Sequence, residues 1–179
     1  MARGARRRGH PGIRPTSRRV RDALLNSLAP RIERSRVLDL FAGRGGLGLG
    51  VLARGAAAVL FVEHDPHLAE GIRGHLAKEG WACRAEVWSR DVIAAVHELG
   101  RQGRTFDLIL MDPPYGEGWI PRTLRAIRAA RLVAPGGLIV AEGHWRDRPD
   151  EEAGFAWLRE LRHGETALWF FEEQQGGPP

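Results

Sequence analysis

The stretch FDLILMDPPY, residues 106–115, decides the fold. Its first six residues are apolar apart from Asp107, which is typical of a parallel strand buried on both faces of a sheet. The strand is expected to end at Asp112, where the chain turns into a loop. In open α/β sheets, ligands bind beyond the carboxyl ends of the strands. The stretch therefore predicts the class of fold and the sheet edge that carries the chemistry.

The loop Asp112-Pro113-Pro114-Tyr115 is a rigid group of hydrogen-bond acceptors. Each proline fixes φ at about −65° and has no N–H, so the carboxylate and the carbonyls meet few competing donors. Such a loop suits a substrate that offers the hydrogens of an amino group, and the tyrosine offers a flat face to a planar ring. An exocyclic amine on a nucleobase fits both features. The alternative is a proline-stiffened turn with a core tyrosine.

A second candidate site follows a strand expected over 36–41. Residues 43–48 match the pattern GxGxxG and lead into a helix expected over about 46–54. Glycine lets the backbone turn tightly and approach a ligand closely, and the first turn of a helix offers free N–H groups. A nucleoside-bearing cofactor fits this loop, although a glycine-rich turn alone is weak evidence.

Two acidic residues at expected strand ends extend this cofactor site. Glu63 stands 20 residues after Gly43, where a carboxylate accepts hydrogen bonds from both hydroxyls of a ribose. Asp91 follows a strand expected over 82–88 and either accepts from the amino group of adenine, caps the next helix, or does both. The segment 64–67, with two histidines and an aspartate, is interpreted as a helix start and not as a metal site, because no further ligand group is nearby.

Composition indicates a single globular domain. The chain has 179 residues, of which 43% are hydrophobic and 27% charged, enough for one proper core. Its one cysteine, Cys83, stands in an apolar run and is interpreted as a packing residue in a reducing compartment. No run approaches the roughly 18 apolar residues of a membrane span, and no secretory signal is recognisable. We therefore expect a cytoplasmic protein.

Basic residues gather at the amino end of the chain. Residues 1–21 hold eight arginines and no acid, so with a total charge of +5 the remainder carries −3. Residues 1–13 lack periodicity and are expected to form a flexible basic arm. An arginine-rich arm on a near-neutral body fits contact with a phosphate backbone. The alternative is a tail that only keeps the protein soluble.

Strand and helix patterns alternate five times along the chain. An amphipathic helix over 17–29, closed by Pro30, is expected to lie against the sheet. Residues 135–137 are expected to turn the chain into a strand at 138–141. The alternation predicts an α/β fold, a doubly wound, mostly parallel sheet with helices on both faces.

A closing antiparallel hairpin is expected from Phe155–Leu161 and Thr166–Phe171, two apolar runs separated by a turn. One domain is expected over residues 14–172, with a frayed tail over residues 173–179.

Together these motifs resemble those of a known class of enzymes. Asp39–Gly45, Glu63 and Asp112–Tyr115 are similar, in this order, to the cofactor loop, ribose acid and amine-binding loop of class I S-adenosylmethionine-dependent methyltransferases. Within that class, residues 13–172 resemble the RsmD family of small-subunit (16S) ribosomal RNA guanine-N2 methyltransferases. The segments that carry this second resemblance are Arg14–Thr16, Val20–Asp22, Leu25–Asn26, Val37–Arg54 and Gly164–Leu168.

The resemblance implies a seven-stranded sheet, S-adenosylmethionine as cofactor, and ribosomal RNA or a small-subunit assembly intermediate as substrate; a monomer is expected. It implies that Asp39 contacts the amino end of the cofactor through water. The catalytic residues are then Asp112, Pro113 and Tyr115. The cofactor residues are Asp39, Phe41, Gly43, Gly45, Glu63, His64 and Asp91. The residues that bind RNA are Arg14, Thr16, Arg18, Arg19, Pro114 and Tyr115.

Three alternatives stay open on the sequence alone. The same chemistry fits another amine, either adenine N6 in DNA or RNA or a glutamine side chain. A nicotinamide-dependent dehydrogenase also uses GxGxxG and an acid, although the Asp-Pro-Pro-Tyr loop counts against it. A non-catalytic RNA-binding module has only the arginine arm in its favour.

Overall fold

The computed structural model describes residues 18–149 and 154–174. The expected RNA-binding residues Arg14 and Thr16, the arm at 1–13 and the tail beyond residue 174 lie outside the described residues, as does the side chain of Arg18. No helix in the described part is long and apolar enough to cross a membrane.

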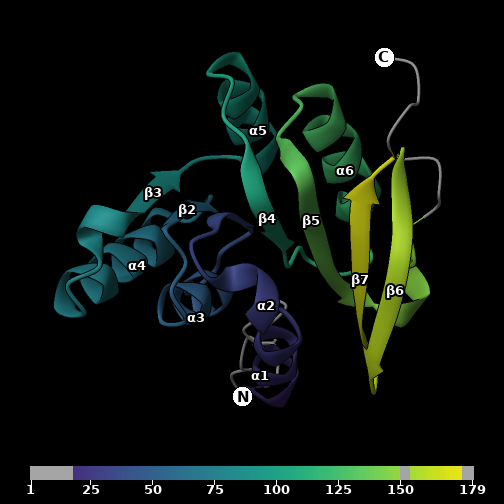
Figure 1. The fold of residues 1–179 in the computed structure, drawn as a ribbon, viewed down its shortest axis with the longest axis horizontal. Helices are drawn as coiled ribbons and strands as arrows, with labels where there is room; N and C mark the ends of the chain where they lie inside the picture. Colours follow the sequence, from purple (N-terminus) through teal and green to yellow (C-terminus); the bar gives the residue numbers. More distant parts are fainter. Residues whose placement is uncertain (1–17, 150–153, 175–179) are drawn as a thin grey trace, which may run out of the picture.

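A seven-stranded sheet forms the centre of the molecule (Figure 1). Its strand order is β3-β2-β1-β4-β5-β7-β6, with β1 to β5 parallel and the β6–β7 hairpin antiparallel. The strands are β1 (Arg36–Leu40), β2 (Ala58–Glu63), β3 (Ala85–Ser89), β4 (Phe106–Met111), β5 (Val133–His144), β6 (Phe155–His163) and β7 (Thr166–Glu173). The mostly parallel sheet with a closing hairpin, predicted from the sequence, is confirmed.

Helices cover both faces of this sheet. The helices are α1 (Arg18–Ser27), α2 (Ala29–Ile32), α3 (Gly46–Leu52), α4 (Pro66–Lys78), α5 (Val92–Arg101) and α6 (Trp119–Ala129), with the short 3-10 helices η1 (Ala82–Arg84) and η2 (Trp145–Asp147). Apolar side chains of α1, α3 and α4 pack into one core, and those of α5 and α6 into another. Strand β4 contributes side chains to both cores: Leu108 and Leu110 belong to the first core, and Ile109 and Met111 belong to the second. This double burial explains its continuous apolar run.

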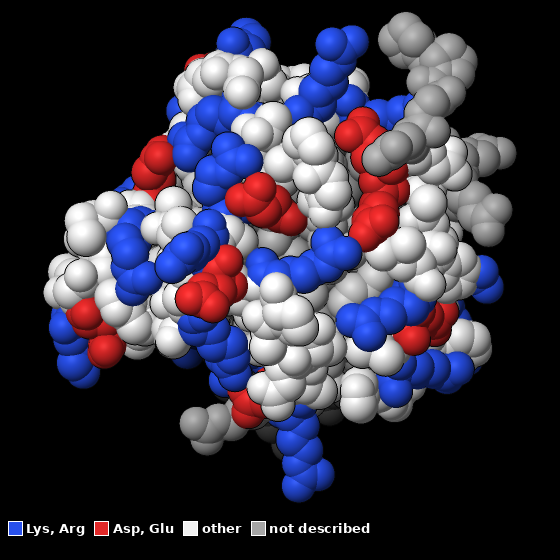
Figure 2. Space-filling model, viewed as in Figure 1, with Lys and Arg blue, Asp and Glu red and all other residues white. Residues whose placement is uncertain are grey.

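Surface charge is mixed on the face drawn in Figure 2. Basic and acidic side chains are interspersed there, with apolar and neutral residues between them. The near-neutral body inferred from the charge balance outside residues 1–21 agrees with this distribution.

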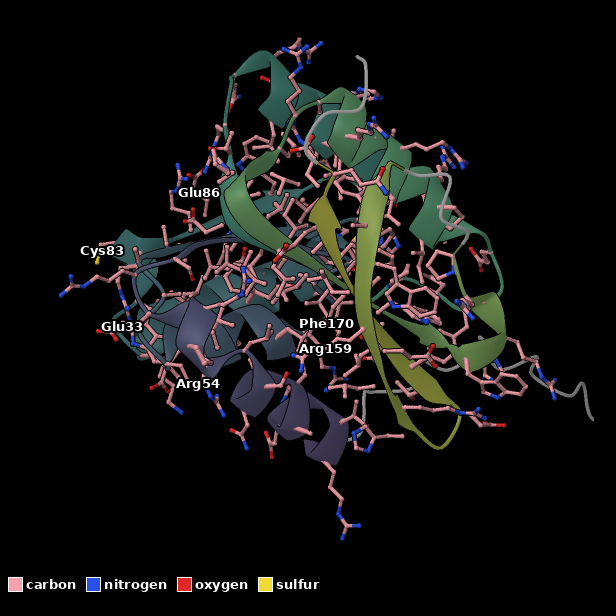
Figure 3. The ribbon with its side chains drawn as sticks, turned by 45° about the vertical axis from the view of Figure 1, so that its right-hand side comes forward. Glu33, Arg54, Cys83, Glu86, Arg159 and Phe170 are labelled. Carbon is pink, nitrogen blue, oxygen red and sulfur yellow. The ribbon has the colours of Figure 1, made fainter. Side chains whose placement is uncertain are left out.

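The interpretation of Cys83 as a packing residue is wrong. The strand expected over 82–88 begins only at Ala85, because residues 82–84 form the 3-10 helix η1. Cys83 is exposed in this helix, at the periphery of the molecule (Figure 3). A short apolar run does not distinguish a strand from a turn, and here the turn prevails.

The turn expected at residues 135–137 is a bulge inside the long strand β5. Val133 pairs with Phe106 of β4, and after a register shift Leu138 pairs with Leu108. A Cβ on Gly137 would lie 2.8 Å from the carbonyl oxygen of Ala134, so this tight bend requires glycine.

Helix α1 lies against the sheet as expected, but Pro30 does not close it. Val20, Leu24 and Leu28 are buried along one side of the helix. The helix ends before Leu28, and Pro30 lies in the first turn of α2. The N–H groups of a first turn have no partner within the helix, so the missing N–H of proline removes no hydrogen bond there.

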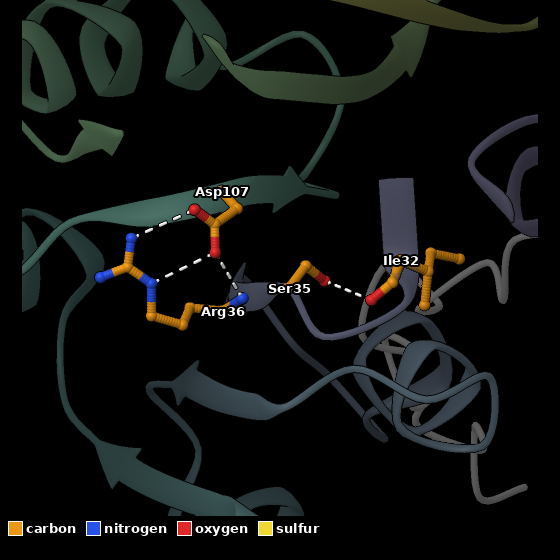
Figure 4. Close-up of polar contacts among 4 residues, drawn as sticks. All are labelled: Ile32, Ser35, Arg36 and Asp107. Carbon is orange, nitrogen blue, oxygen red and sulfur yellow. Dashed lines mark hydrogen bonds and ion pairs between the residues drawn. The ribbon is translucent and has the colours of Figure 1, made fainter. Parts of the chain in front are cut away.

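The start of β1 is held by polar contacts (Figure 4). The hydroxyl of Ser35 donates to the carbonyl of Ile32 at 2.6 Å. The guanidinium of Arg36 donates through Nε and Nη2 to the two oxygens of Asp107, at 3.2 and 3.1 Å. This ion pair lowers the pKa of Asp107 and accounts for the one charged residue in the apolar run of β4.

The carboxyl ends of β1, β2, β4 and β5 meet at one edge of the sheet. The turn of the β6–β7 hairpin lies at the same edge, because Thr166 pairs with His144, the last residue of β5. Helix α1 projects at the same end of the molecule as this turn (Figures 1 and 3). The loops that follow these strands build the candidate site.

Candidate active site

The loop between β1 and α3 bends sharply, as GxGxxG predicts. Gly43 and Gly45 have left-handed φ values of 56° and 78°. Phe41 shares this conformation with φ 60°, which costs a residue with a side chain about 1–2 kcal/mol. Its ring meets Trp119 edge-on with centroids 5.5 Å apart. A Cβ on Gly48 would overlap an aromatic ring of β2 at 2.2 Å, so glycine lets α3 close against the sheet.

Asp39 is buried beneath this loop, and its Oδ2 accepts the N–H of Gly48 at 2.9 Å. Burial raises the pKa of Asp39 to about 7. The hydrogen bond from Gly48 lowers this pKa, and the charges of Asp112 and Glu63 raise it further. Three carboxyl groups from β1, β2 and the loop after β4 thus act on one another. A cationic ligand would stabilise their ionised forms.

Glu63 is buried at the end of β2 and joins two loops. Its Oε2 accepts the N–H of Gly43 at 2.6 Å, and its Oε1 accepts the N–H of Asp65 at 2.9 Å. Nδ1 of the exposed His64 lies 2.9 Å from the same Oε1. A carboxylate has about four acceptor positions, so these contacts leave room for a hydroxyl. The assignment of Glu63 and His64 to the ribose stays a prediction.

Asp91 is the N-cap of α5. Its Oδ1 accepts the N–H of Ala94 at 2.9 Å, which confirms the capping role that the sequence allowed. The residue is exposed beyond the end of β3. Its contact with an adenine amino group stays a prediction.

The Asp112–Tyr115 loop and the residue after it are tied to four neighbouring segments. The N–H of Asp112 points to the carbonyl of Leu40 at the end of β1, at 3.4 Å. The Tyr115 hydroxyl lies 3.5 Å from Oε1 of Glu142 on β5 and 3.4 Å from Oγ1 of Thr166 on β7. The N–H of the next residue, Gly116, donates to Asp147 of η2 at 2.9 Å. Residues separated by 27 to 51 positions in sequence therefore fix this loop.

Tyr115 is not a core tyrosine, because 39% of it is exposed. Partial burial raises the pKa of its hydroxyl, which therefore stays protonated at neutral pH. A small hollow, partly open to solvent, lies between the Pro113–Tyr115 loop and the start of α6 at Trp119. The exposed ring offers a planar group a face to stack on, three residues after Asp112.

Glu142, Thr166 and Asp147 were missed by the sequence reasoning. Glu142 could have been found, because it follows an expected strand at the same edge as Glu63 and is only 2% exposed. Thr166 and Asp147 carry no such signal, since only the pairing of β5 with β7 and the turn into η2 bring them to Tyr115 and Gly116.

The remaining expected residues are only partly described. Arg19 is exposed on α1, and Pro114 is exposed in the Asp112–Tyr115 loop. Their RNA contacts stay predictions. Arg21, which the sequence reasoning did not select, lies over the first turn of α3, because a Cβ on Gly46 would be 3.2 Å from its Nη1. Within the described ranges, no three His, Cys, Asp or Glu side chains are placed to hold a metal ion.

The geometry fits S-adenosylmethionine. The glycine loop admits close backbone approach, and buried Asp39, with Glu63 and Asp112 near it, suits a ligand that carries positive charge. The residues that would hold the cofactor are those of the glycine loop with Asp39, Glu63 and Asp91.

Comparison with known proteins agrees with this geometry. The model of the family described as Conserved hypothetical protein 95 matches residues 4–172. Ribosomal RNA small subunit methyltransferase D of Escherichia coli K12 is 32% identical over 170 residues, 93% of this chain and 83% of that protein. The putative rRNA methyltransferase YlbH of Bacillus subtilis is 30% identical over 163 residues, 90% of this chain and 88% of that protein.

Solved structures show the same fold. The putative methyltransferase yhhF from Escherichia coli superposes with a TM-score of 0.81 at 28% identity, covering 92% of each chain. A hypothetical protein from Thermus thermophilus gives 0.76 at 30% identity, covering 96% of this chain and 95% of that one. These matches exclude the dehydrogenase and the non-catalytic module. The chain belongs to the family of Conserved hypothetical protein 95 and is an RsmD-like, S-adenosylmethionine-dependent methyltransferase.

Proposed function

We propose that this enzyme methylates the exocyclic N2 amino group of a guanine in ribosomal RNA. The observation that carries the proposal is the Asp112–Tyr115 loop, an acceptor group fixed at the sheet edge beside an exposed aromatic ring. The relatives named as ribosomal RNA methyltransferases support the class of substrate. The enzyme acts as a cytoplasmic monomer on ribosomal RNA or on a small-subunit assembly intermediate.

The amino group of guanine is a weak nucleophile, because its lone pair is delocalised into the ring. The Asp112 carboxylate and the Pro113 carbonyl accept its two hydrogens and aim the nitrogen at the reacting carbon. These acceptors favour a pyramidal nitrogen as positive charge develops on it. When bound, S-adenosylmethionine supplies an electrophilic methyl group on a sulfonium. The extra proton leaves to Asp112 or to water after transfer.

Tyr115 holds the base against this acceptor group. Its ring is exposed for stacking, while its hydroxyl is anchored near Glu142 and Thr166. A base must leave its neighbours to reach such a pocket, which is easier from a loop than from a helix. Stacking on Tyr115 compensates part of the cost of extrusion.

A second amine remains a candidate, because one set of relatives is named for adenine. The tRNA1(Val) (adenine(37)-N6)-methyltransferase of Cronobacter sakazakii is 30% identical over 148 residues, 76% of this chain and 59% of that protein. Adenine N6 presents the same two hydrogens to Asp112. The two ribosomal RNA enzymes described above match over 163 and 170 residues and are covered to 88% and 83% of their length, which is why guanine is preferred.

The test is mass spectrometry of nucleosides. Unmodified small-subunit ribosomal RNA is incubated with the full chain and methyl-labelled cofactor, then digested. Labelled N2-methylguanosine is expected from the wild type and, in the same time, about 10²–10³-fold less from Asp112→Ala. Labelled N6-methyladenosine would show that adenine, and not guanine, is the target base. Absence of label from both naked ribosomal RNA and small-subunit assembly intermediates would refute the proposal.

A further inference from the structure

Three rings lead outward from the catalytic loop across the sheet edge. The centroids of Tyr115 and His144 are 6.2 Å apart, and those of His144 and Trp145 are 5.8 Å apart. His144 ends β5, and Trp145 begins η2. We call Tyr115, His144 and Trp145 the aromatic row.

Two arginines flank the outer end of the aromatic row. The guanidinium of Arg146 lies 5.0 Å from the ring centroid of Trp145, and that of Arg162, on β6, lies 4.3 Å from it. Both arginines are exposed, whereas Trp145 is half-buried. Glu165 is an exposed acid in the neighbouring hairpin turn. Two exposed guanidinium groups are thus held over one ring at this end.

The aromatic row is fixed relative to the catalytic loop. Asp147, two residues after Trp145, accepts the N–H of Gly116, and the N–H of Trp145 donates to the carbonyl of Glu165 at 3.0 Å. The Nε of Arg162 donates to the carbonyl of Gly164 at 3.2 Å. The loop, η2 and the hairpin turn therefore form one connected surface, which needs little ordering to bind a ligand.

We propose that the aromatic row and its two arginines bind the unpaired nucleotides next to the target base. The proposal rests on the proposed function, since it extends the RNA site beyond Tyr115. Single-stranded RNA is recognised by stacking of bases on aromatic and guanidinium planes, with basic groups on its phosphates. Both elements are present here, directly continuous with the residue that would hold the target base. Of these residues only Tyr115 was predicted from the sequence, where the other RNA-binding residues were Arg14, Thr16, Arg18, Arg19 and Pro114.

The first experiment measures binding of a fluorescent, short single-stranded oligoribonucleotide to the full chain, by anisotropy. Trp145→Leu should raise the dissociation constant roughly 5- to 100-fold, the range for losing one base–aromatic stack. The double variant Arg146→Ala with Arg162→Ala should flatten the slope of log K against log salt by about 1.4, because two phosphate contacts are lost. A duplex of the same sequence should be bound more weakly than the single strand.

A matched control lies at the opposite edge of the sheet. Arg84 stands 5.8 Å over the ring of Trp81, in the connection that precedes β3. Arg84→Ala removes the same kind of stacked guanidinium far from the catalytic loop, and RNA affinity should not change. Calorimetric titration with S-adenosylmethionine should give wild-type affinity in every variant, which also verifies folding.

The outcomes separate this proposal from the proposed function. Suppose that the folded Trp145→Leu variant and the folded double arginine variant keep the RNA affinity and salt slope of the wild type. That result would refute RNA binding by the aromatic row and leave the methylation proposal intact. If Arg84→Ala weakened RNA affinity as much as the double arginine variant does, the proposal would also be refuted, because the effect would then reflect non-specific attraction between RNA and positive charge. A wild type that neither binds nor methylates RNA would refute the proposed function, and the aromatic row with it.

Discussion

Titration of buried Asp39 should make cofactor affinity depend on pH. With a pKa of about 7, Asp39 is about 9% ionised at pH 6 and about 50% ionised at pH 7. If the ionised form receives the amino end of S-adenosylmethionine, the apparent dissociation constant scales with the inverse of that fraction. It should fall about 5-fold between pH 6 and pH 7. Within this window the α-amino group of the cofactor, with an ordinary pKa of about 7.7–8.0, stays cationic.

The assay is calorimetric titration of S-adenosylmethionine at constant ionic strength. Asp39→Asn keeps an oxygen for the N–H of Gly48 but does not ionise, so its weaker affinity should be flat over the same window. His64 lies 2.9 Å from Glu63, so the comparison is repeated in a His64→Gln background. Equal wild-type affinity at both pH values, or an unchanged slope in Asp39→Asn, would refute the reasoning.

Four further predictions concern the candidate site and the basic arm. The pKa of Asp39 in the folded, cofactor-free protein lies above its unfolded value. Its contribution to stability is therefore fully present below pH about 4 and is lost as pH rises through about 7. The melting temperatures of the wild type and Asp39→Asn should converge at acid pH and separate toward neutral pH. Asp112→Ala should lower the single-turnover rate by about 10²–10³ with cofactor affinity intact, by analogy with losing one oxyanion-hole donor, whereas Tyr115→Ala should act mainly on the Michaelis constant for RNA. Near-wild-type turnover in Asp112→Ala would contradict the mechanism. Glu63→Ala should weaken cofactor binding by about 1–3 kcal/mol in calorimetry, and unchanged affinity in the folded variant would remove Glu63 from the ribose site. Deleting residues 1–12 should raise the RNA dissociation constant and flatten its salt dependence, and an unaltered slope would leave the arm a solubilising tail.

The fold was predictable because its strongest signals are local. Five of the six residues of β4 are apolar, on both faces of the strand, and the sheet buries both faces. Glycine spacing and an acid at a strand end likewise placed the loop at Gly43 and Glu63 at one edge, where the structure joins them at 2.6 Å. Each of these inferences needed only the period of a strand and the rule that parallel strands end at the same edge.

The failures came where tertiary context decides between two local solutions. Pro30 can end a helix or begin one, and burial of Leu28 with Ile32 selects a second short helix. A glycine pair after a proline can be a turn or a bulge, and pairing of Val133 with Phe106 selects the bulge. Cys83 stands in a run too short to define a face, and η1 leaves it exposed. Nothing within a few residues of these positions distinguishes the alternatives.

The acids of the site also bear on product release. Asp39 has its pKa raised by burial and by the charges of Asp112 and Glu63, so a bound cation relieves repulsion among the three groups. Methyl transfer removes the positive charge of the sulfonium, while the carboxyl groups stay in place. We therefore expect the site to hold the charged cofactor more strongly than the neutral thioether that remains after transfer. The same burial that makes Asp39 costly to ionise thus favours exchange of spent cofactor for fresh cofactor. Asp39→Asn should narrow the affinity ratio between the two forms, measurable by calorimetry at pH about 7, and an unchanged ratio would separate Asp39 from this discrimination.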